Sequence, residues 1–142
     1  MFGPHLILEA YGSPKNKLAD LNLICQVLEE YPAKLNMTKI MPPYVFRYNG
    51  GDVPEDWGVS GVVLIAESHI SIHSFPEKQF VTLDIFSCRD FVIEDAIEYF
   101  CSIFEPEHYE EQVLQRGREF PKSAGRAGRI VDAERRRLAA KR

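Results

Sequence analysis

The sequence predicts an α+β fold, a two-layer sandwich in which a mostly antiparallel sheet has two helices packed on one face. Two kinds of pattern lead to this prediction. Several short segments alternate polar and apolar residues with the period of two that is typical of half-buried strands. Two longer segments repeat apolar residues at the three- to four-residue spacing of amphipathic helices. Strands and two helices in this order favour helices gathered on one face of a sheet.

The first predicted elements are a strand and a helix. Residues 5–11 form the strand, which ends at the Gly-Ser-Pro sequence of residues 12–14. Residues 15–30 form the helix, and Pro32 closes it because proline cannot continue a helix. The apolar stripe of this helix consists of Leu18, Leu21, Ile24, Cys25 and Leu28.

The middle of the chain is expected to form an edge strand, a loop and a central strand. Residues 37–41 and 44–48 have the pattern of a strand interrupted by Pro42-Pro43, which belongs at an edge or a bulge. Residues 49–58 are rich in turn-forming residues and predict a loop. Residues 62–66 form a continuous apolar run, which is typical of a strand covered on both faces.

Two alternating strands, a second helix and a last strand complete the prediction. Residues 69–73 and 80–88 alternate polar and apolar side chains, so each strand should bury one face. The second helix is expected to begin near Asp90, a suitable N-cap residue, and to end at residues 105–106. Residues 109–120 predict the final strand.

One face of this sheet lacks cover, because both helices are expected on the other face. A second copy of the sheet would supply the cover, which predicts a homodimer.

The composition is that of one ordinary globular domain. With 142 residues, 45% of them hydrophobic and 27% charged, the chain is long enough for a single core. No apolar run approaches the roughly 18–20 residues that cross a bilayer, and the N-terminus lacks a signal-peptide pattern. The three cysteines have neither metal-site spacing nor the even number of a disulfide framework. These features predict a cytoplasmic protein without a membrane segment or a metal site.

Charge is divided between an acidic body and a basic tail. From Arg116 to the C-terminus there are ten Lys and Arg residues against three Asp and Glu, while the formal net charge of the whole chain is −4. We therefore expect a domain at residues 1–120 and a basic tail at residues 121–142. Such a run of charge is most simply a solvated end, so no nucleic-acid binding is predicted. The acidic body suits a cationic small-molecule substrate.

The most informative segment is residues 58–73, GVSGVVLIAESHISIH. It places the Glu67-Ser68 peptide bond between two apolar runs, with Ser60 upstream and His73 downstream. A buried serine hydroxyl can attack the carbonyl that precedes it, which is the first step of self-cleavage. Taken alone, a Ser-His-x-x-x-His stretch is more often a half-solvated sheet face, and we assign His69 to that class.

The GVSG and ESHISIH motifs at this spacing resemble the proenzyme of S-adenosylmethionine decarboxylase, in its short bacterial and archaeal class. The resemblance implies self-cleavage into a β chain, residues 1–67, and an α chain, residues 68–142, that begins with a pyruvoyl group made from Ser68. This processing needs an oxyanion donor near the Glu67 carbonyl and a base near the Ser68 α-carbon. The pyruvoyl ketone forms a Schiff base with a substrate amine and withdraws electrons as a carboxylate leaves. No metal or diffusible cofactor is implied.

The same resemblance assigns roles to individual residues. It makes His73 an acid–base group of processing, Ser60 a residue that positions the ester intermediate, and Cys88 the proton donor to the product. In the sequence HSFPEK, Phe75 and Glu77 match positions that stack on adenine and hold the ribose of the substrate. From the residues alone, Phe75 and Cys88 also suit ordinary packing, and Glu77 suits a turn.

The function implied by the resemblance is conversion of S-adenosylmethionine to its decarboxylated form and CO2, which supplies aminopropyl groups for spermidine biosynthesis. Two alternatives stay open. The loop before Ser60 carries Asp52, Glu55 and Asp56, and three acids near a pocket would also suit ornithine or arginine as the substrate of the same pyruvoyl group. The more distant alternative is an unprocessed homologue that acts as a binding or regulatory subunit.

Overall fold

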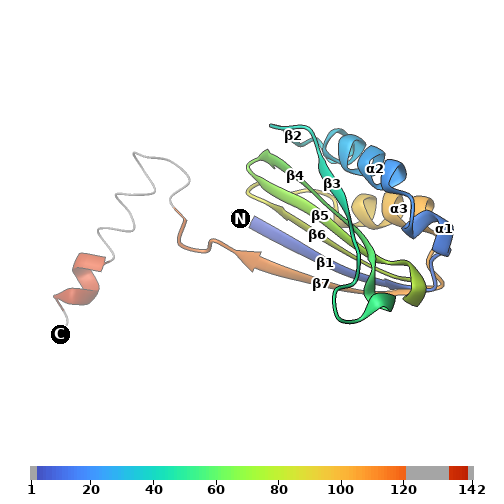
Figure 1. The fold of residues 1–142 in the computed structure, drawn as a ribbon. Coiled ribbons are helices and arrows are strands. Elements are labelled where there is room, and N and C mark those ends of the chain that lie inside the picture. The colour runs from blue at the N-terminus through green and yellow to red at the C-terminus, as the bar shows by residue number, and fades with distance from the viewer. Residues whose placement is uncertain (1–2, 121–134, 141–142) are drawn as a thin grey trace.

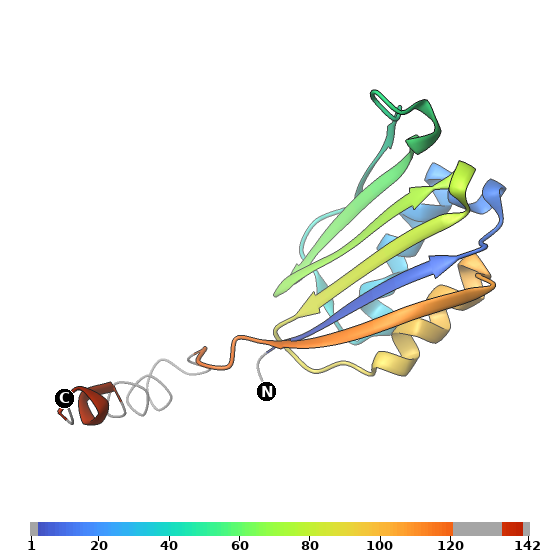
Figure 2. The ribbon, with the colours of Figure 1, turned by 90° about the horizontal axis from the view of Figure 1, so that it is seen from below.

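The computed structural model describes residues 3–120 and 135–140, in which one sheet has helices on one side (Figure 1). Among these residues, seven strands form the sheet in the order β2-β4-β5-β6-β1-β7, and β3 also pairs with β4. All of the strand pairs are antiparallel. Figure 2 shows from a second direction that the helices leave the other face of the sheet open. The predicted α+β two-layer sandwich is confirmed.

The elements follow the predicted order. The strands are β1 (Gly3–Tyr11), β2 (Thr38–Lys39), β3 (Tyr44–Tyr48), β4 (Gly58–Ala66), β5 (Ser68–Phe75), β6 (Phe80–Ser87) and β7 (His108–Arg116). The helices that pack on the sheet are α1 (Lys15–Leu18), α2 (Leu21–Lys34) and α3 (Ile93–Phe104), with single 3-10 turns at η1 (Pro54–Asp56) and η2 (Pro76–Lys78). Residues 135–139 form a further short helix. In the described part of the chain, no helix has the length and apolar character needed to span a membrane. Of the predicted basic tail, residues 121–134 and 141–142 lie outside the described residues.

The helix predicted at residues 15–30 is two helices. The break lies at Asp20, whose carboxylate accepts a hydrogen bond of 3.0 Å from the backbone N–H of Leu23. This side-chain cap satisfies one of the free N–H groups at the start of α2 and so favours a new helix there. Pro32 does not close the helix as predicted, since α2 continues to Lys34. Its missing N–H affects only the last turn, and the helix ends two residues later.

The helix α3 begins later than predicted. Its first residue is Ile93, and Val92 occupies the N-cap position that was expected for Asp90. Glu94 and Asp95 lie in the first turn, where negative charge interacts favourably with the positive end of the helix dipole. Charge in the first turn therefore stabilises this helix start without a capping side chain.

The core lies between the sheet and the helices α2 and α3. Within a single chain β4 is not covered on both faces as predicted: Val63 and Ile65 are buried, whereas Leu64 is 42% exposed on the open face. The run is aliphatic throughout, so its alternation shows in burial and not in residue type. The open face therefore carries apolar side chains as well as polar ones.

Candidate active site

The predicted site residues fall into three groups at different places along the sheet. The first group is Ser60 and His73; the second is Glu67, Ser68 and Cys88; the third is Phe75 and Glu77. Strand β5 connects the groups, because it begins at Ser68 and ends at Phe75.

Ser60 and His73 face each other across β4 and β5 on the open face of the sheet. They are directly opposed in the strand register, and Ser60 Oγ lies 2.9 Å from His73 Nδ1. This contact fixes the imidazole at one nitrogen and leaves Nε2 available to exchange a proton. His73 is exposed in a single chain. The pair is thus an oriented acid–base group on an open surface.

The two glycines of the GVSG motif let β4 approach its neighbours. A Cβ atom at Gly58 would lie 1.7 Å from the carbonyl oxygen of Ser74, and one at Gly61 would lie 2.6 Å from a methyl carbon of Leu28 on α2. A side chain at either position would force a strand or a helix to move. The motif therefore holds Ser60 at a fixed place between β5 and α2.

The Glu67-Ser68 bond lies where β4 turns into β5. Ser68 has a φ angle of 119°, a backbone conformation that L-residues rarely adopt and that stores strain. The backbone N–H of Cys88 donates a hydrogen bond of 3.3 Å to the carbonyl oxygen of Glu67. This is the carbonyl that the Ser68 hydroxyl would attack, and a donor on its oxygen stabilises the negative charge of that attack. The donor to this carbonyl is a backbone group, which no side-chain motif reveals.

Cys88 follows β6 and is half-buried. Burial raises the pKa of its thiol above the ordinary value of 9.0, and the hydrogen bond and negative charge of Glu67 raise it further. The positive charge of Arg116 acts in the opposite direction on this pKa. The thiol therefore stays protonated at neutral pH, which suits a proton donor better than a nucleophile.

The Ser60–His73 pair is too far from Ser68 to react with it inside one chain. Ser68 and His73 are five residues apart on β5, and the pairing of this strand with β6 runs without interruption between them. A strand rises about 3.3 Å per residue, so the two Cα atoms lie about 17 Å apart. The structure thus keeps the histidine pair away from the peptide bond that it was expected to help cleave.

Phe75 lies in an aromatic cluster at the end of β5. Its ring centroid is 5.7 Å from that of Phe80, whose ring is in turn 5.2 Å from that of Tyr11. Phe75 is half-buried in a single chain. Packing accounts for part of this ring, and its contact with a ligand stays a prediction.

Glu77 belongs to a set of polar contacts, here called the loop clip, that joins the loop before β4 to the turn after β5. Lys15 Nζ lies 2.7 Å from Glu77 Oε1, and Trp57 Nε1 donates to the same oxygen at 3.2 Å. Lys15 first, and then Trp57, lower the pKa of this carboxyl group, which is therefore ionised at neutral pH. A second ion pair of 2.5 Å joins Lys78 to Asp56 across the same gap. The sequence did not single out Lys15 or Trp57, although the tryptophan directly precedes GVSG.

A hollow of about 400 Å³ lies on the open face beside the Ser60–His73 pair. Phe46 from β3 and His69 from β5 line it together with that pair. Burial, followed by the nearby His5, lowers the pKa of His69, so this imidazole is neutral at pH 7. His69 was expected to be an ordinary sheet-face residue, and its place in the hollow gives it access to a ligand there.

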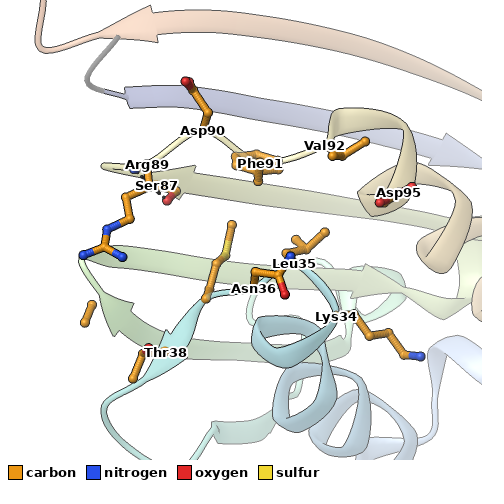
Figure 3. A pocket seen from close by; sticks show the side chains of 12 residues that line it. Lys34, Leu35, Asn36, Thr38, Ser87, Arg89, Asp90, Phe91, Val92 and Asp95 are labelled. Carbon is orange, nitrogen blue, oxygen red and sulfur yellow. Dashed lines mark hydrogen bonds between the residues drawn. The ribbon is translucent and has the colours of Figure 1, made fainter.

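A second cavity, of about 310 Å³, lies on the helix side of the sheet behind the turn between β4 and β5 (Figure 3). This turn, residues 66–68, is here called the cleavage turn because it contains the bond predicted to be cleaved. Ala66 and Ser87 line it at the sheet, and the end of α2 and the segment that leads into α3 form its other walls. None of the predicted catalytic residues lines it. The cavity therefore borders the cleavage turn from behind and is distinct from the hollow on the open face.

The surroundings of Ser68 fit a group that is made from the chain itself. The backbone at Ser68 is strained, the carbonyl before it has a hydrogen-bond donor, and a protonated thiol lies beside it. Among the described residues, no group of three or more His, Cys, Asp and Glu side chains is arranged to hold a metal ion.

Residues 4–117 match the model of a protein family described as S-adenosylmethionine decarboxylase. The S-adenosylmethionine decarboxylase proenzyme of Archaeoglobus fulgidus is 40% identical over 116 residues, which make up 81% of this chain and 97% of that protein. The proenzyme of the same name from Pyrococcus horikoshii is 35% identical over 116 residues, again 81% of this chain and 78% of that protein.

A solved structure agrees with these sequence relatives. The crystal structure of the adenosylmethionine decarboxylase from Aquifex aeolicus superposes with a TM-score of 0.69 at 31% identity. The alignment covers 82% of this chain and 91% of that chain. All three groups of site residues lie within residues 4–117, which match the family model.

Proposed function

Because this chain belongs to the S-adenosylmethionine decarboxylase family, we propose that it cleaves itself at the Glu67-Ser68 bond and then decarboxylates S-adenosylmethionine. The main support is the geometry at that bond, where the Cys88 N–H already contacts the Glu67 carbonyl beside a strained Ser68. The product would be the aminopropyl donor of spermidine biosynthesis.

Self-cleavage begins with an acyl shift. The Ser68 hydroxyl oxygen bonds to the Glu67 carbonyl carbon, the C–N bond of the peptide breaks, and the hydroxyl proton passes to the new amine. The Cys88 N–H stabilises the oxyanion on the way. A base then removes the Ser68 α-proton, the bond from Cβ to the ester oxygen breaks, and Glu67 leaves as a carboxylate. Hydrolysis releases ammonia and completes the new N-terminal group.

A second copy of the chain would supply the base. His73 of the same chain is about 17 Å from Ser68, which is beyond proton-transfer distance. If two open faces pack with their strands running in opposite directions, the Ser60–His73 end of one subunit lies over the cleavage turn of the other. A twofold axis between the sheets builds this contact twice. His73 of the partner subunit would then act on Ser68.

The open face has the character of such an interface. Among its exposed residues, Tyr44 is 65% exposed, Phe46 50%, Leu64 42% and Leu114 41%. Large exposed apolar side chains on an uncovered sheet face favour contact with another chain. These exposures support the homodimer that the uncovered sheet predicts.

In the cleaved enzyme, the pyruvoyl group would supply the electron sink for loss of CO2. The residues around it bind, orient and protonate. The Cys88 thiol, held protonated by its surroundings, would return a proton to the substrate α-carbon. Phe75 and Glu77 lie at the His73 end of β5, so those of the partner subunit would reach the ligand. There Phe75 would stack on the adenine and the Glu77 carboxylate would accept hydrogen bonds from the ribose hydroxyls.

Ornithine or arginine is less well supported as a substrate. The argument for these amino acids rests on three acids of the loop before β4, and one of them, Asp56, is already paired with Lys78. The ionised Glu77 is suited to a ribose, which a basic amino acid lacks. The nucleoside substrate is therefore favoured.

Intact-protein mass spectrometry tests the proposal. The wild-type chain should separate into two fragments, with the second beginning at position 68 as a pyruvoyl group, and it should release CO2 from S-adenosylmethionine. Ser68→Ala should stay whole and inactive, whereas Ser71→Ala, a matched change on the open face of the same strand, should still be cut. A folded wild-type chain that remains whole and inactive would contradict the proposal and favour a binding subunit.

A further inference from the structure

Arg116 holds a fixed position near the cleavage turn. It is the last residue of β7, where it pairs with Gly3 of β1. Its guanidinium lies 3.8 Å from the centroid of the Phe86 ring, a close cation–π contact. A Cβ atom at Gly3 would lie 2.8 Å from the same ring, so only glycine leaves room for Phe86 there. The stacked ring therefore fixes the charge of Arg116 over β6.

This charge lies beside Cys88. Phe86 is the next-to-last residue of β6, and Cys88 directly follows the end of this strand. Two residues span about 6.6 Å, so the guanidinium stacked on Phe86 lies within about one side-chain length of the thiol. The electrostatic effect agrees with this placement, because Arg116 lowers the pKa of both Cys88 and His69.

The cation of Arg116 is available to a ligand. Among the described residues, no carboxylate lies within ion-pair distance of it. The acid on the neighbouring part of the open face, Asp84, is 2.8 Å from His5 Nε2 and is thus already paired. Arg116 itself is exposed, at the end of an edge strand. Its donors can therefore reach an anion that binds beside Phe86.

We propose that Arg116 binds the α-carboxylate of the substrate. The proposal rests on the proposed function, in which the Cys88 thiol protonates the substrate α-carbon. The carboxylate is attached to that same carbon, so a cation beside the thiol is also beside the carboxylate. The α-carboxylate is the one anionic group of S-adenosylmethionine, and a planar guanidinium matches it with two parallel hydrogen bonds.

This assignment makes Arg116 a residue of affinity and selectivity. An ion pair stabilises the full charge of the bound carboxylate and stabilises the transition state less, because the charge leaves that group as CO2 forms. Arg116 should therefore lower KM without raising kcat. It also separates substrate from product, since the decarboxylated product has no anion to bind.

Equilibrium binding to an inert enzyme tests the proposal without turnover. Borohydride reduces the pyruvoyl ketone of the cleaved enzyme to an alcohol, and titration calorimetry then measures binding of S-adenosylmethionine and of its carboxyl methyl ester. The wild-type protein should prefer the acid by about tenfold, the size expected for one charge-assisted contact. Arg116→Gln should abolish this preference, and Arg116→Lys should keep part of it. Arg118→Gln, a matched loss of a cation two residues further on, should leave it unchanged.

The kinetics give a second readout on the unreduced enzyme. Arg116→Gln should raise KM about tenfold with kcat unchanged or increased, while self-cleavage proceeds as in the wild type. An Arg116→Gln enzyme that keeps the wild-type preference for the acid, or that loses kcat at unchanged KM, would overturn the role of Arg116. The proposed function would still stand. A wild-type chain that stays whole and binds neither compound would overturn the proposed function and this inference together. If Arg116→Gln does not fold, a full wild-type preference in Arg116→Lys would still contradict the bidentate contact.

Discussion

The two ends of β5 are built differently, and the difference shows how the site is divided. At the cleavage end, Ser68 is strained, Cys88 is half-buried, and a backbone N–H contacts the Glu67 carbonyl. At the other end, the Ser60–His73 pair is hydrogen-bonded, relaxed and exposed. In the proposed function, one end has the bond to be broken and its oxyanion donor, and the other has the acid–base group. Neither end is complete in a single chain.

The largest effects are expected at Cys88, whose thiol and backbone N–H can be removed separately. Cys88→Ala keeps the backbone N–H and loses the thiol, so cleavage should continue while decarboxylation falls by about 10²–10⁴-fold. Cys88→Pro removes the N–H, so cleavage itself should slow by about 10²–10³-fold. Fragment ratios by mass spectrometry and CO2 release by radiometric assay measure the two rates.

The matched control for Cys88 is Cys101→Ala on α3, which should alter neither rate. Circular dichroism would show whether the proline variant is folded. If Cys88→Pro is folded and cleaves at the wild-type rate, the contact with the Glu67 carbonyl has no part in the acyl shift. Unchanged turnover in Cys88→Ala would mean that the thiol is not the proton donor and that Cys88 only packs.

A smaller effect is expected at the far end of the sheet, in the loop clip. Trp57→Phe removes the N–H that Glu77 accepts but keeps an aromatic ring for Arg47, which stacks 4.4 Å from the tryptophan. Because Glu77 is exposed and retains Lys15, KM for S-adenosylmethionine should rise only about threefold. Self-cleavage should not change, because neither the Ser60–His73 contact nor the Cys88–Glu67 contact involves the clip.

Steady-state kinetics of Trp57→Phe, of Glu77→Gln and of the double variant complete this test by comparing their KM values. If Trp57 acts through Glu77, the double variant should be no worse than Glu77→Gln alone. Additive effects would mean that Trp57 influences substrate binding by another route. A slower self-cleavage in Trp57→Phe would contradict the view that the loop clip affects substrate binding alone.

The sequence predicted the local parts of this structure well, because strands and helices follow from residue periodicity. It failed at the break at Asp20 and at the start of α3, where a side-chain cap and first-turn charges decide where a helix begins. It also failed at the aliphatic run of β4, where residue type does not show which side chains are buried. The strand periodicity also gives the distance between Ser68 and His73, which the ESHISIH motif alone does not show. Once Ser68 and His73 share one strand, their spacing alone implies about 17 Å between them.

The remaining site features could not be predicted from the sequence, because they join distant parts of the chain. The Cys88 N–H meets the Glu67 carbonyl across a turn, and Trp57 meets Glu77 between two loops. Arg116 reaches Phe86 only because β7 lies beside β1 at the edge of the sheet. No short motif contains these pairs, and two of the three involve a backbone group or a surface arginine without a distinctive pattern.

The central claim is that each cleavage site is completed by the other subunit, and a mixed dimer tests it most directly. Ser68→Ala and His73→Ala chains, each with its own affinity tag, would be co-expressed and purified through both tags, and the fragments identified by mass spectrometry. Each variant alone should stay whole. In the mixed dimer the His73→Ala chain should be cut, because the Ser68→Ala chain supplies an intact His73 to its Ser68. A His73→Ala chain that stays whole in the mixed dimer, or that cuts itself when expressed alone, would contradict the shared site.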